Sequence, residues 1–118
     1  MNRGYIKLIL IAVVLIGGAW LVLQKDKPAR ANLDELAQCL TGQGVIMYGA
    51  DWCPHCQNEK KAFGDSFRHI NYVECPDEPD RCLAAGVSAF PTWVFPDGKK
   101  LEGEQGPDRL AQESGCGL

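Results

Sequence analysis

The sequence has little basic charge outside its first 31 residues. Those residues carry a net charge of +4 and residues 32–118 carry −7, which together give the −3 of the whole chain. Proteins that bind nucleic acid depend on lysine and arginine side chains that neutralise phosphate groups. The acidic balance of residues 32–118 therefore excludes nucleic acid as an expected partner. The sequence also lacks internal repeats and low-complexity tracts, which argues against a repeat architecture.

Charge is also absent from residues 8–23. With Tyr5, Ile6 and Lys7 before it, this apolar run reaches 19 residues, which is long enough to cross a bilayer as a helix if the lysine extends to the interface. A cleaved signal peptide is the alternative, because residues 29–31 resemble a small-residue cleavage site. The run is longer than a usual signal core and charged residues separate it from that site, so an uncleaved anchor is the preferred interpretation.

The apolar run divides the chain into three parts, and its flanking basic residues would meet anionic lipid headgroups. We predict an N-terminal membrane anchor over residues 1–24, a juxtamembrane linker over residues 25–31 and a single domain over residues 32–118. Two basic residues precede the run and three follow it, a count that slightly favours a cytoplasmic domain.

All cysteines lie in the predicted domain, which is small and would gain stability from covalent cross-links. The six residues are Cys39, Cys53, Cys56, Cys75, Cys82 and Cys116. An even number of cysteines in a small domain behind an export-type segment indicates an oxidising compartment. We give this indication more weight than the charge count. We therefore predict a membrane-anchored domain on the periplasmic or extracytoplasmic side.

Hydrophobic patterning predicts an α/β domain with the order α-β-α-β-α-β-β-α. Continuous apolar runs between turn residues predict strands, and capping residues or prolines before an apolar period predict helix starts. The expected elements are a helix that starts at Asn32 as its N-cap and ends at Gly42 or Gly44, a strand over 45–48, a helix from Cys53 to Gly64, a strand over 70–75, a helix over 80–85, strands over 90–95 and 100–104, and a helix over 107–112.

Residues 51–56 read Asp-Trp-Cys-Pro-His-Cys and come shortly after the predicted strand over 45–48. A Cys-X-X-Cys pair by itself is weak evidence, because chance produces such spacings. Here Pro54 suits the first position of a helix, which places Cys53 at the helix N-terminus. Backbone N–H groups and the helix dipole favour a thiolate there. Cys53 is therefore the expected nucleophile, and Cys56, one turn deeper, is the expected resolving thiol.

Three features together resemble the thioredoxin superfamily over residues 33–115. They are the buried strand that leads into the Cys-Pro-His-Cys motif, Pro91 in a Phe-Pro-Thr segment 35 residues after Cys56, and the terminal hairpin followed by a helix. More closely, the chain resembles the thioredoxin-like domain fused to, or partnering, bacterial vitamin K epoxide reductase homologues, on segments 47–56, 71–75 and 90–93. The resemblance implies a thioredoxin-like fold with a central mixed four-stranded sheet behind an N-terminal transmembrane helix.

The resemblance also implies roles for residues around the motif. Pro91 would have a cis peptide bond that faces the active cysteines, a minority state that the fold must impose. Phe90 would present its backbone to a substrate peptide, which can pair with it as an added strand, and Trp52 would shield the disulfide. The Cys-Pro-His-Cys sequence also occurs in strongly oxidising bacterial disulfide-forming enzymes, so His55 is expected to stabilise the Cys53 thiolate. A solvated His55 without a redox role is the alternative.

One position departs from the family pattern. Thioredoxin itself has a buried aspartate six residues before the first active cysteine, and this sequence has Met47 there. Proton transfer to and from Cys56 therefore needs another route. The departure favours an oxidising role over that of a thioredoxin-type reductase.

The remaining cysteines are expected to form two structural disulfides. Cys75 and Cys82 lie seven residues apart across a proline-containing turn, and a bond between Cys39 and Cys116 would tie the first helix to the C-terminus. Closing the longer loop would stabilise the domain by about 4–5 kcal/mol in the chain-entropy model. Two alternatives stay open: buried free thiols, and a second redox pair formed by Cys75 and Cys82.

The sequence thus predicts a membrane-tethered thiol–disulfide oxidoreductase that exchanges disulfides with exported proteins and favours oxidation. By resemblance, a second partner is an integral-membrane, quinone-linked thiol oxidoreductase of the vitamin K epoxide reductase type. The expected redox group is the Cys53–Cys56 disulfide itself, with no cofactor and no metal. A copper- or zinc-binding module that uses Cys53, His55 and Cys56 is the alternative from another class, since thiolates and imidazole suit these metals. A structural binding domain is a third, which the intact motif and Pro91 disfavour.

Overall fold

The computed structural model describes residues 2–23 and 29–118, with side chains described at 2–18 and 32–118. Its elements are α1 (Arg3–Leu23), α2 (Ala29–Gly42), β1 (Ile46–Gly49), α3 (Pro54–Phe63), the 3₁₀-helix η1 (Gly64–His69), β2 (Tyr72–Glu74), α4 (Pro79–Ala84), β3 (Thr92–Val94), β4 (Lys100–Glu102) and α5 (Gly106–Ser114). After α1, the helices and strands follow the predicted order, with η1 inserted behind α3.

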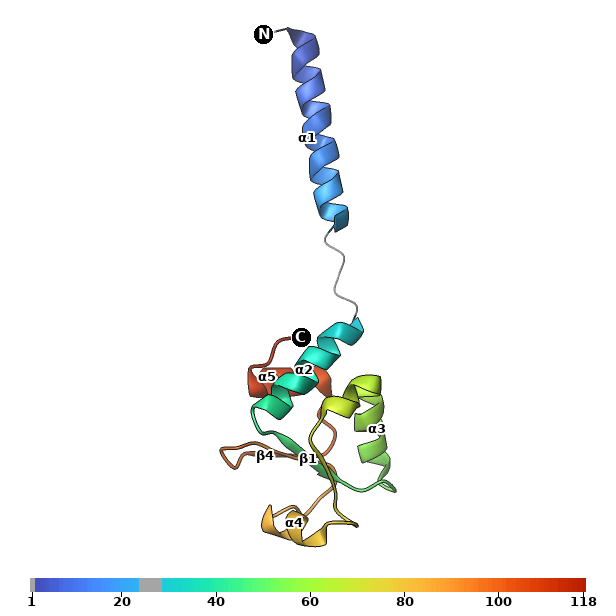
Figure 1. Cartoon of the computed structure of the whole chain (residues 1–118), viewed down its shortest axis with the longest axis vertical. Coiled ribbons are helices and arrows are strands. Elements are labelled where there is room, and N and C mark those ends of the chain that lie inside the picture. The colour runs from blue at the N-terminus through green and yellow to red at the C-terminus, as the bar shows by residue number, and fades with distance from the viewer. Residues whose placement is uncertain (1, 24–28) are drawn as a thin grey trace.

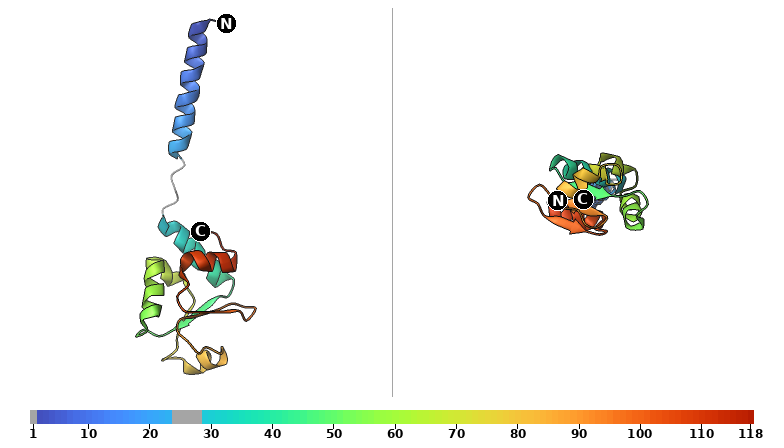
Figure 2. Two further views of the ribbon diagram at one scale, coloured as in Figure 1. Left: turned by 180° about the vertical axis from the view of Figure 1, so that it is seen from behind. Right: turned by 90° about the horizontal axis from the view of Figure 1, so that it is seen from below.

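The strands form one mixed sheet in the order β2-β1-β3-β4. β1 pairs parallel with β2 and antiparallel with β3, and β3 pairs antiparallel with β4. The turn between β3 and β4 projects from one edge of the domain (Figure 2). The predicted four-stranded mixed sheet with a terminal hairpin is therefore confirmed, and the chain has a thioredoxin-like α/β fold.

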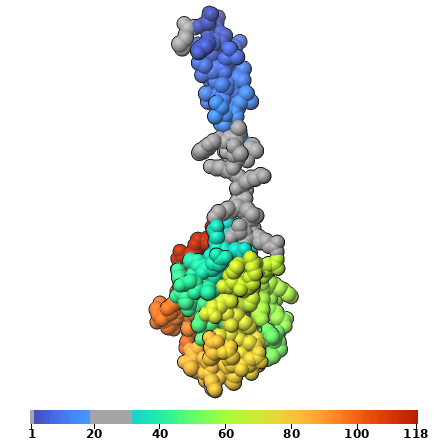
Figure 3. Space-filling model, in the orientation of Figure 1, coloured from blue at the N-terminus to red at the C-terminus, as the bar shows by residue number. Residues whose placement is uncertain are grey.

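Helices cover both faces of this sheet (Figure 1). The helices α2, α3, η1 and α5 pack together on one face, and α4 lies on the other, at the end of the domain opposite α2 (Figure 3). Successive side chains of a strand point to opposite faces. Met47 of β1 therefore lies in the larger core with Trp93, whereas Tyr48 lies in the smaller core with Val73. Each face of β1 thus has its own hydrophobic core.

The helix that carries the motif starts and ends where its sequence predicts. Pro54 takes the first position of α3, where its missing N–H leaves no hydrogen bond unmade. Gly64 follows the last residue with a φ of 55°, a backbone region that glycine adopts without strain. This glycine allows the chain to pass from α3 directly into η1.

The start of α2 differs from the prediction. The helix begins at Ala29, so Asn32 lies inside it and is not its N-cap. Alanine and arginine are strong helix formers, which explains why the helix extends past the expected cap. The linker predicted over residues 25–31 therefore loses its last three residues to α2, and residues 24–28 lie outside the described residues.

Three strands are shorter than predicted, and one of them is the strand expected over 100–104, which ends at Glu102 as β4. The strand expected over 70–75 is reduced to β2, because the N–H of Ile70 donates to the Phe67 carbonyl and closes η1. The strand expected over 90–95 is reduced to β3. Pro91 has no N–H to give to a ladder, which explains why β3 starts after it.

α1 is the element expected to anchor the chain. Its apolar side chains, among them Leu8, Val14 and Ile16, are exposed, and it lies apart from the domain in Figure 1. A helix needs about 20 predominantly apolar residues to span a bilayer. Among the residues that the structure describes, no helix is long and apolar enough to cross a membrane. The membrane anchor predicted over residues 1–24 stays a prediction.

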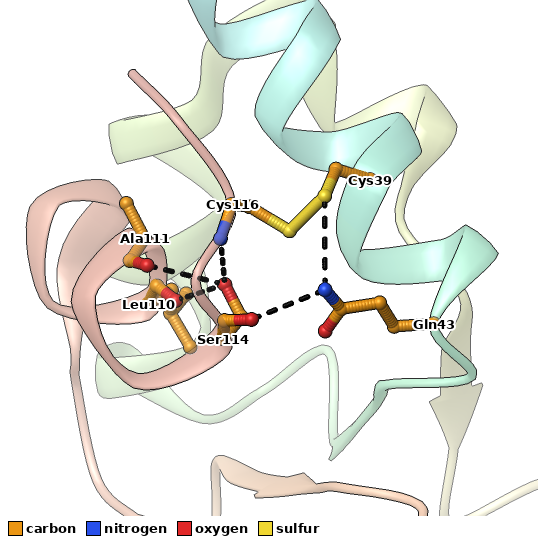
Figure 4. Close-up of a disulfide and its surroundings, with 6 residues drawn as sticks. All are labelled: Cys39, Gln43, Leu110, Ala111, Ser114 and Cys116. Carbon is orange, nitrogen blue, oxygen red and sulfur yellow. Dashed lines mark hydrogen bonds between the residues drawn. A yellow bond between two sulfur atoms is a disulfide. The ribbon is translucent and has the colours of Figure 1, made fainter.

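A disulfide between Cys39 and Cys116 ties α2 to the segment that follows α5 (Figure 4). Beside it, the Gln43 side-chain amide donates to the Ser114 carbonyl oxygen at 3.1 Å. The Ser114 hydroxyl donates to the Leu110 carbonyl oxygen at 2.6 Å and accepts the N–H of Cys116 at 3.1 Å. These contacts hold the C-terminal segment against α2, so the covalent bond and the hydrogen bonds close the same junction.

Candidate active site

The two cysteines of the motif lie where α3 begins. Cys53 is the residue before the helix, Pro54 takes its first position, and Cys56 follows one turn later. Both thiols are free and both residues are buried, Cys53 at 5% exposure and Cys56 at 0%. The Cys56 N–H donates to the Cys53 sulfur at 3.3 Å, which satisfies one of the unpaired donors of the helix start. The Cys53 sulfur therefore faces the positive end of the helix dipole.

Cys56 has different surroundings. Burial raises the pKa of Cys56 to about 12, and the hydrogen bond and charge of Cys53 raise it too, whereas the Ala50 backbone and the Lys60 charge lower it. Burial disfavours the charged form of an acid, so the Cys56 thiol is protonated at neutral pH. A reaction that uses Cys56 as a thiolate must therefore move this proton.

The Phe90–Pro91 segment lies across from the motif, and the peptide bond between these residues is cis. The Cys53 thiol donates a hydrogen bond to the Phe90 carbonyl oxygen at 3.6 Å. Trp52 is 69% exposed, and its ring meets the Phe90 ring edge-on with the centroids 6.1 Å apart. The structure therefore brings together Cys53, Trp52, Phe90 and Pro91, all of which the sequence singles out. Trp52 lies beside Phe90 as an exposed ring.

His55 has a partner that the sequence does not predict. Its Nδ1 lies 2.6 Å from Oε1 of Glu104, in the loop after β4, and the Asn58 side-chain amide donates to the same oxygen at 2.9 Å. The hydrogen bond from Asn58, followed by that from His55, lowers the pKa of the Glu104 carboxyl below its usual value. We expected His55 to stabilise the Cys53 thiolate, and the described hydrogen bond of the ring goes to Glu104 instead. Any positive charge on His55 is therefore offset by a carboxylate.

The alternative metal site would use Cys53, His55 and Cys56. Within the described residues, no group of three or more His, Cys, Asp or Glu side chains is arranged to hold a metal ion. The three residues named for that alternative therefore do not form such a cluster in the structure. No observation in the site favours the metal-binding interpretation.

Polar residues on β2, just before α3 and in the last turn of α3 are joined by hydrogen bonds near the motif. The Tyr72 hydroxyl donates to Oε2 of Glu74 at 2.5 Å, and Oε1 of Glu74 accepts the N–H of Asp51 at 2.9 Å. The Lys60 ammonium donates to Oδ1 of Asp51 at 2.9 Å and lies 4.2 Å from the centre of the Tyr72 ring. No sequence motif points to these residues. The only sequence clue is the apolar Met47, which indicates that some other residue must handle protons.

A second disulfide, between Cys75 and Cys82, joins the end of β2 to α4 on the other face of the sheet. Both residues are buried in the smaller core. With Leu83, Val87 and Phe90, this disulfide lines an open apolar pocket of about 300 Å³. Phe90 therefore lies between this pocket and the sulfur of the active cysteine, since its carbonyl accepts the hydrogen bond of Cys53.

The chain is similar to known proteins of two kinds, a thiol–disulfide oxidoreductase and thioredoxins of known structure. No family model matches the chain. The chain is similar to the thiol–disulfide oxidoreductase LTO1 of Arabidopsis thaliana, with 40% identity over 92 residues that cover 70% of this chain and 24% of that protein. It thus spans about a quarter of the length of this curated relative.

Two thioredoxins of known structure also match. The thioredoxin of Fasciola hepatica is 23% identical, with a TM-score of 0.39, over 60% of this chain and 74% of that chain. Mitochondrial thioredoxin 3 of Saccharomyces cerevisiae, in its oxidized form, is 26% identical, with a TM-score of 0.39, over 61% of this chain and 74% of that chain. No relation to vitamin K epoxide reductase is shown by these matches. The sheet order and the similarity to a thiol–disulfide oxidoreductase support the thioredoxin-like superfamily.

Proposed function

We propose that this chain is a thiol–disulfide oxidoreductase in which Cys53 and Cys56 exchange a disulfide with client proteins. The placement of Cys53 carries the proposal. The residue lies at the start of α3 and is 5% exposed. Its sulfur contacts the Phe90 carbonyl, next to the cis peptide bond of Pro91. A client cysteine can reach this sulfur, and a client backbone can pair with Phe90 as an added strand. The similarity to a thiol–disulfide oxidoreductase supports the same reaction class.

In the oxidising direction, a client thiolate attacks the Cys53 sulfur of the closed Cys53–Cys56 disulfide. The bond between the active cysteines breaks, Cys56 leaves as a thiolate and takes up a proton, and a mixed disulfide joins the client to Cys53. A second client thiolate then displaces Cys53, and the client leaves with a disulfide. Two electrons pass to the active cysteines, and another partner must remove them before the next cycle.

We favour oxidation as the working direction. The helix start stabilises Cys53 in the reduced state, and a stabilised reduced form makes the disulfide a stronger oxidant. Met47, at 0% exposure, replaces the buried carboxylate that the resemblance to thioredoxin would lead us to expect. In the reducing direction the steps reverse: Cys53 attacks a client disulfide, and Cys56 releases the client.

We also propose an extracytoplasmic location, with the N-terminal apolar segment as a membrane tether and a quinone-linked thiol oxidoreductase of the vitamin K epoxide reductase type as the partner that removes electrons. Support for the location comes from the two further cysteine pairs, which are closed as disulfides in a small domain. The exposed apolar side chains of α1 support the tether. Alkylation of introduced surface cysteines by an impermeant reagent on intact cells tests the location, and protection of those cysteines would contradict it.

The client surface is expected to be apolar. The exposed Trp52 ring contacts the Phe90 ring, and Phe90 lines a pocket together with Leu83 and Val87. Apolar side chains that flank a client cysteine would lose water-exposed surface in this region. We therefore expect unfolded or extended clients with large apolar residues near their cysteines to react faster than clients without them.

The test of the reaction class is oxidation of reduced ribonuclease and reduction of insulin by the full chain, by Cys53→Ser and by Cys56→Ser. We expect Cys53→Ser to abolish both reactions and Cys56→Ser to accumulate mixed disulfides. The matched control is the double variant Cys39→Ala/Cys116→Ala, which removes two thiols and leaves the motif intact. Full activity in Cys53→Ser would defeat the proposed function.

The test of direction is the reduction potential of the Cys53–Cys56 pair, measured against a glutathione buffer. A value of about −120 mV corresponds to a strong oxidant, and a value of about −270 mV corresponds to a thioredoxin-type reductant. We expect a value closer to the first. A value at or below the thioredoxin level would overturn the oxidising assignment and leave the reaction class standing.

A further inference from the structure

The fold leaves one step of the proposed reaction without an obvious acid or base. Cys56 must lose its proton to attack a mixed disulfide and must regain one after it leaves as a thiolate. The residue at the place of the expected buried carboxylate, Met47, is apolar and fully buried, so it moves no proton. A group on a neighbouring strand must therefore lie within reach of the Cys56 sulfur.

The register of the sheet identifies that strand. Met47 of β1 is paired with Tyr72 of β2, and Gly49 is paired with Glu74. Paired residues point to the same face of a sheet, and residues two apart on one strand do so as well. Tyr72 packs against the core that contains Cys56, so Tyr72 and Glu74 both lie on the face that carries α3. The carboxylate missing from β1 is thus present one strand away.

Gly49 leaves the space in which these groups meet. A Cβ at this position would lie 2.9 Å from Sγ of Cys56 and 3.3 Å from the Tyr72 hydroxyl oxygen. Both distances are shorter than ordinary contacts, so the sulfur and the hydroxyl occupy the volume that a side chain would fill. Glycine is therefore required here for close approach. The Tyr72 hydroxyl and the Cys56 sulfur thus border the same side of Gly49.

Tyr72 and Glu74 are already connected for proton transfer. The Tyr72 hydroxyl donates to Oε2 of Glu74 at 2.5 Å, the short distance of a hydrogen bond to an ionised acceptor. The other carboxylate oxygen accepts the Asp51 N–H at 2.9 Å, which fixes the orientation of the carboxylate. Glu74 is half-buried, so its carboxyl group can exchange protons with solvent. The phenol beside Gly49 is therefore connected through the Glu74 carboxylate to water.

We propose that Tyr72 and Glu74 are the proton-transfer pair of Cys56, a role that rests on the proposed disulfide exchange. When Cys56 acts as nucleophile, its S–H bond breaks, the proton passes to the Tyr72 oxygen, and the phenol proton passes to Glu74. The Cys56 thiolate then attacks the Cys53 sulfur of the mixed disulfide, and the client leaves as a thiolate. When Cys56 leaves during oxidation, Glu74 and Tyr72 return a proton by the same path.

The charges around the pair suit this role. Burial raises the pKa of Tyr72, and its hydrogen bond to Glu74 and the negative charges of Glu74, Cys56 and Asp51 raise it further. The phenol therefore stays neutral and passes a proton on without holding a negative charge itself. Lys60 lies over the Tyr72 ring and lowers the pKa of Cys56, which stabilises the thiolate once the proton has left. The hydrogen bond and charge of Lys60 hold the pKa of the exposed Asp51 carboxyl below its usual value.

Glu59 on α3 is the rival buried carboxyl group. Its two oxygens accept the N–H groups of Gln105 and Gly106 at 2.7 and 2.9 Å, so they are used at the start of α5. Burial raises the pKa of Glu59, and these backbone hydrogen bonds lower it. The geometry therefore favours Tyr72 and Glu74 over Glu59.

The experiment uses the full chain with its structural disulfides closed and Cys53 and Cys56 reduced. Reaction with 5,5′-dithiobis(2-nitrobenzoate) first places thionitrobenzoate on Cys53, and Cys56 then releases it in a second absorbance phase. The second phase is measured by stopped flow from pH 6 to pH 9. Wild type, Tyr72→Phe and Glu74→Gln are compared, because these substitutions remove the hydroxyl or the charge and keep the side-chain shape.

We expect both variants to slow the second phase by about 100-fold at pH 7, the lower range of general acid–base effects. We also expect a changed pH profile. The wild-type rate should vary little over this pH range, whereas the variants depend on free Cys56 thiolate, whose amount rises about tenfold per pH unit. Tyr48→Phe, on the opposite face of β1, and Glu102→Gln, on β4, are the matched controls and should leave the rate and the slope unchanged.

Several outcomes overturn the inference. Wild-type rates and slopes in Tyr72→Phe and Glu74→Gln would do so, as would slower rates with an unchanged pH slope, which indicate a structural effect. A changed slope in Glu59→Gln alone would assign the role to Glu59. If Tyr72→Phe does not fold, Glu74→Gln decides by itself, because its side chain is only half-buried. If the wild-type chain never releases the second thionitrobenzoate, the proposed function itself is contradicted. If the release is normal and the variants do not change its pH dependence, only the role of Tyr72 and Glu74 is overturned.

Discussion

The two faces of the sheet each carry a pair of cysteines, and Phe90 packs against both cores. On one face, Cys53 and Cys56 are free thiols at the start of a helix. On the other face, Cys75 and Cys82 form a disulfide between a strand end and a short helix. The pairs differ in what surrounds them. The first has a helix N-terminus, Lys60 and the Tyr72–Glu74 hydrogen bond nearby, whereas the pocket beside the second is lined by apolar side chains and prolines.

The difference shows that spacing alone does not make a cysteine pair reactive. Exchange requires a sulfur that a partner can reach, a positive potential that favours its thiolate, and a path for the proton of the second thiol. The first face supplies a group for each requirement. The second supplies a buried, covalently closed cross-link in an apolar setting, which is the arrangement of a structural disulfide.

The strongest test of this contrast removes a sulfur from each face. We expect Cys53→Ser to abolish disulfide exchange, because Cys56, the other thiol of the motif, is completely buried. We expect Cys75→Ala/Cys82→Ala to keep most of the activity. Both are measured by oxidation of reduced ribonuclease. If the double variant folds and loses exchange, the second pair carries electrons and the contrast fails.

A second test compares the two structural disulfides by stability. Removing the Cys39–Cys116 bond, with a sequence separation of 77 residues, should lower the free energy of unfolding by about 4–5 kcal/mol in the chain-entropy model. Removing the Cys75–Cys82 bond, with a separation of 7, should lower it by about 2–3 kcal/mol. Urea unfolding of the two alanine double variants measures both values. Equal losses would show that local packing and not loop length sets these contributions.

A third test uses pH to expose the titrating thiol of the first face. The pKa of Cys56 is raised from 9.0 to about 12 in the folded state, so the fold favours the protonated thiol. Its contribution to stability is therefore fully present below pH 9 and is lost as the pH rises from 9 towards 12. We expect the reduced chain to lose more stability than the oxidised chain between pH 8 and pH 10.5 in urea unfolding. Cys56→Ser should show the shallower pH dependence of the oxidised chain, and parallel curves for the reduced and oxidised wild-type forms would contradict the assignment.

The smallest expected effect concerns the carboxylate beside His55. Glu104→Gln removes a negative charge near the first face, so it should favour the reduced, thiolate form of Cys53 and raise the reduction potential. The His55–Glu104 pair is exposed, so the reduction potential should change by only about 10 mV. A glutathione redox titration measures it, with Glu102→Gln as the control. A lower potential in Glu104→Gln would mean that the carboxylate acts on the redox pair mainly by holding His55 in place.

The order of elements follows from local patterns in the sequence. Pro54 and Gly64 set the limits of α3 through their own backbone preferences, and the apolar run of β1 predicts a central strand. Such features depend on neighbouring residues, so the sequence reveals them. The start of α2 at Ala29 is not predicted, because an N-cap preference at Asn32 and the helix propensity of the residues before it compete within a small energy difference.

The motif residues of the site are also visible in the sequence, but their partners are not. Glu104 lies 49 residues from His55 along the chain, and only the folded hairpin brings them together. Tyr72 and Glu74 lie beside Met47 and Gly49 through strand register, which depends on the pairing of β1 with β2. The absence of an acid at Met47 predicts that a replacement exists and does not identify it.

The unequal burial of the two active sulfurs has a consequence for the order of events. Cys56 is completely buried, so every partner, whether it brings a disulfide or takes one away, meets the same atom of Cys53. A client and an electron acceptor therefore cannot be bound through sulfur at the same time, and each must leave before the other arrives. The chain is expected to show ping-pong kinetics, in which an excess of either partner slows turnover by occupying the form of the protein that the other needs.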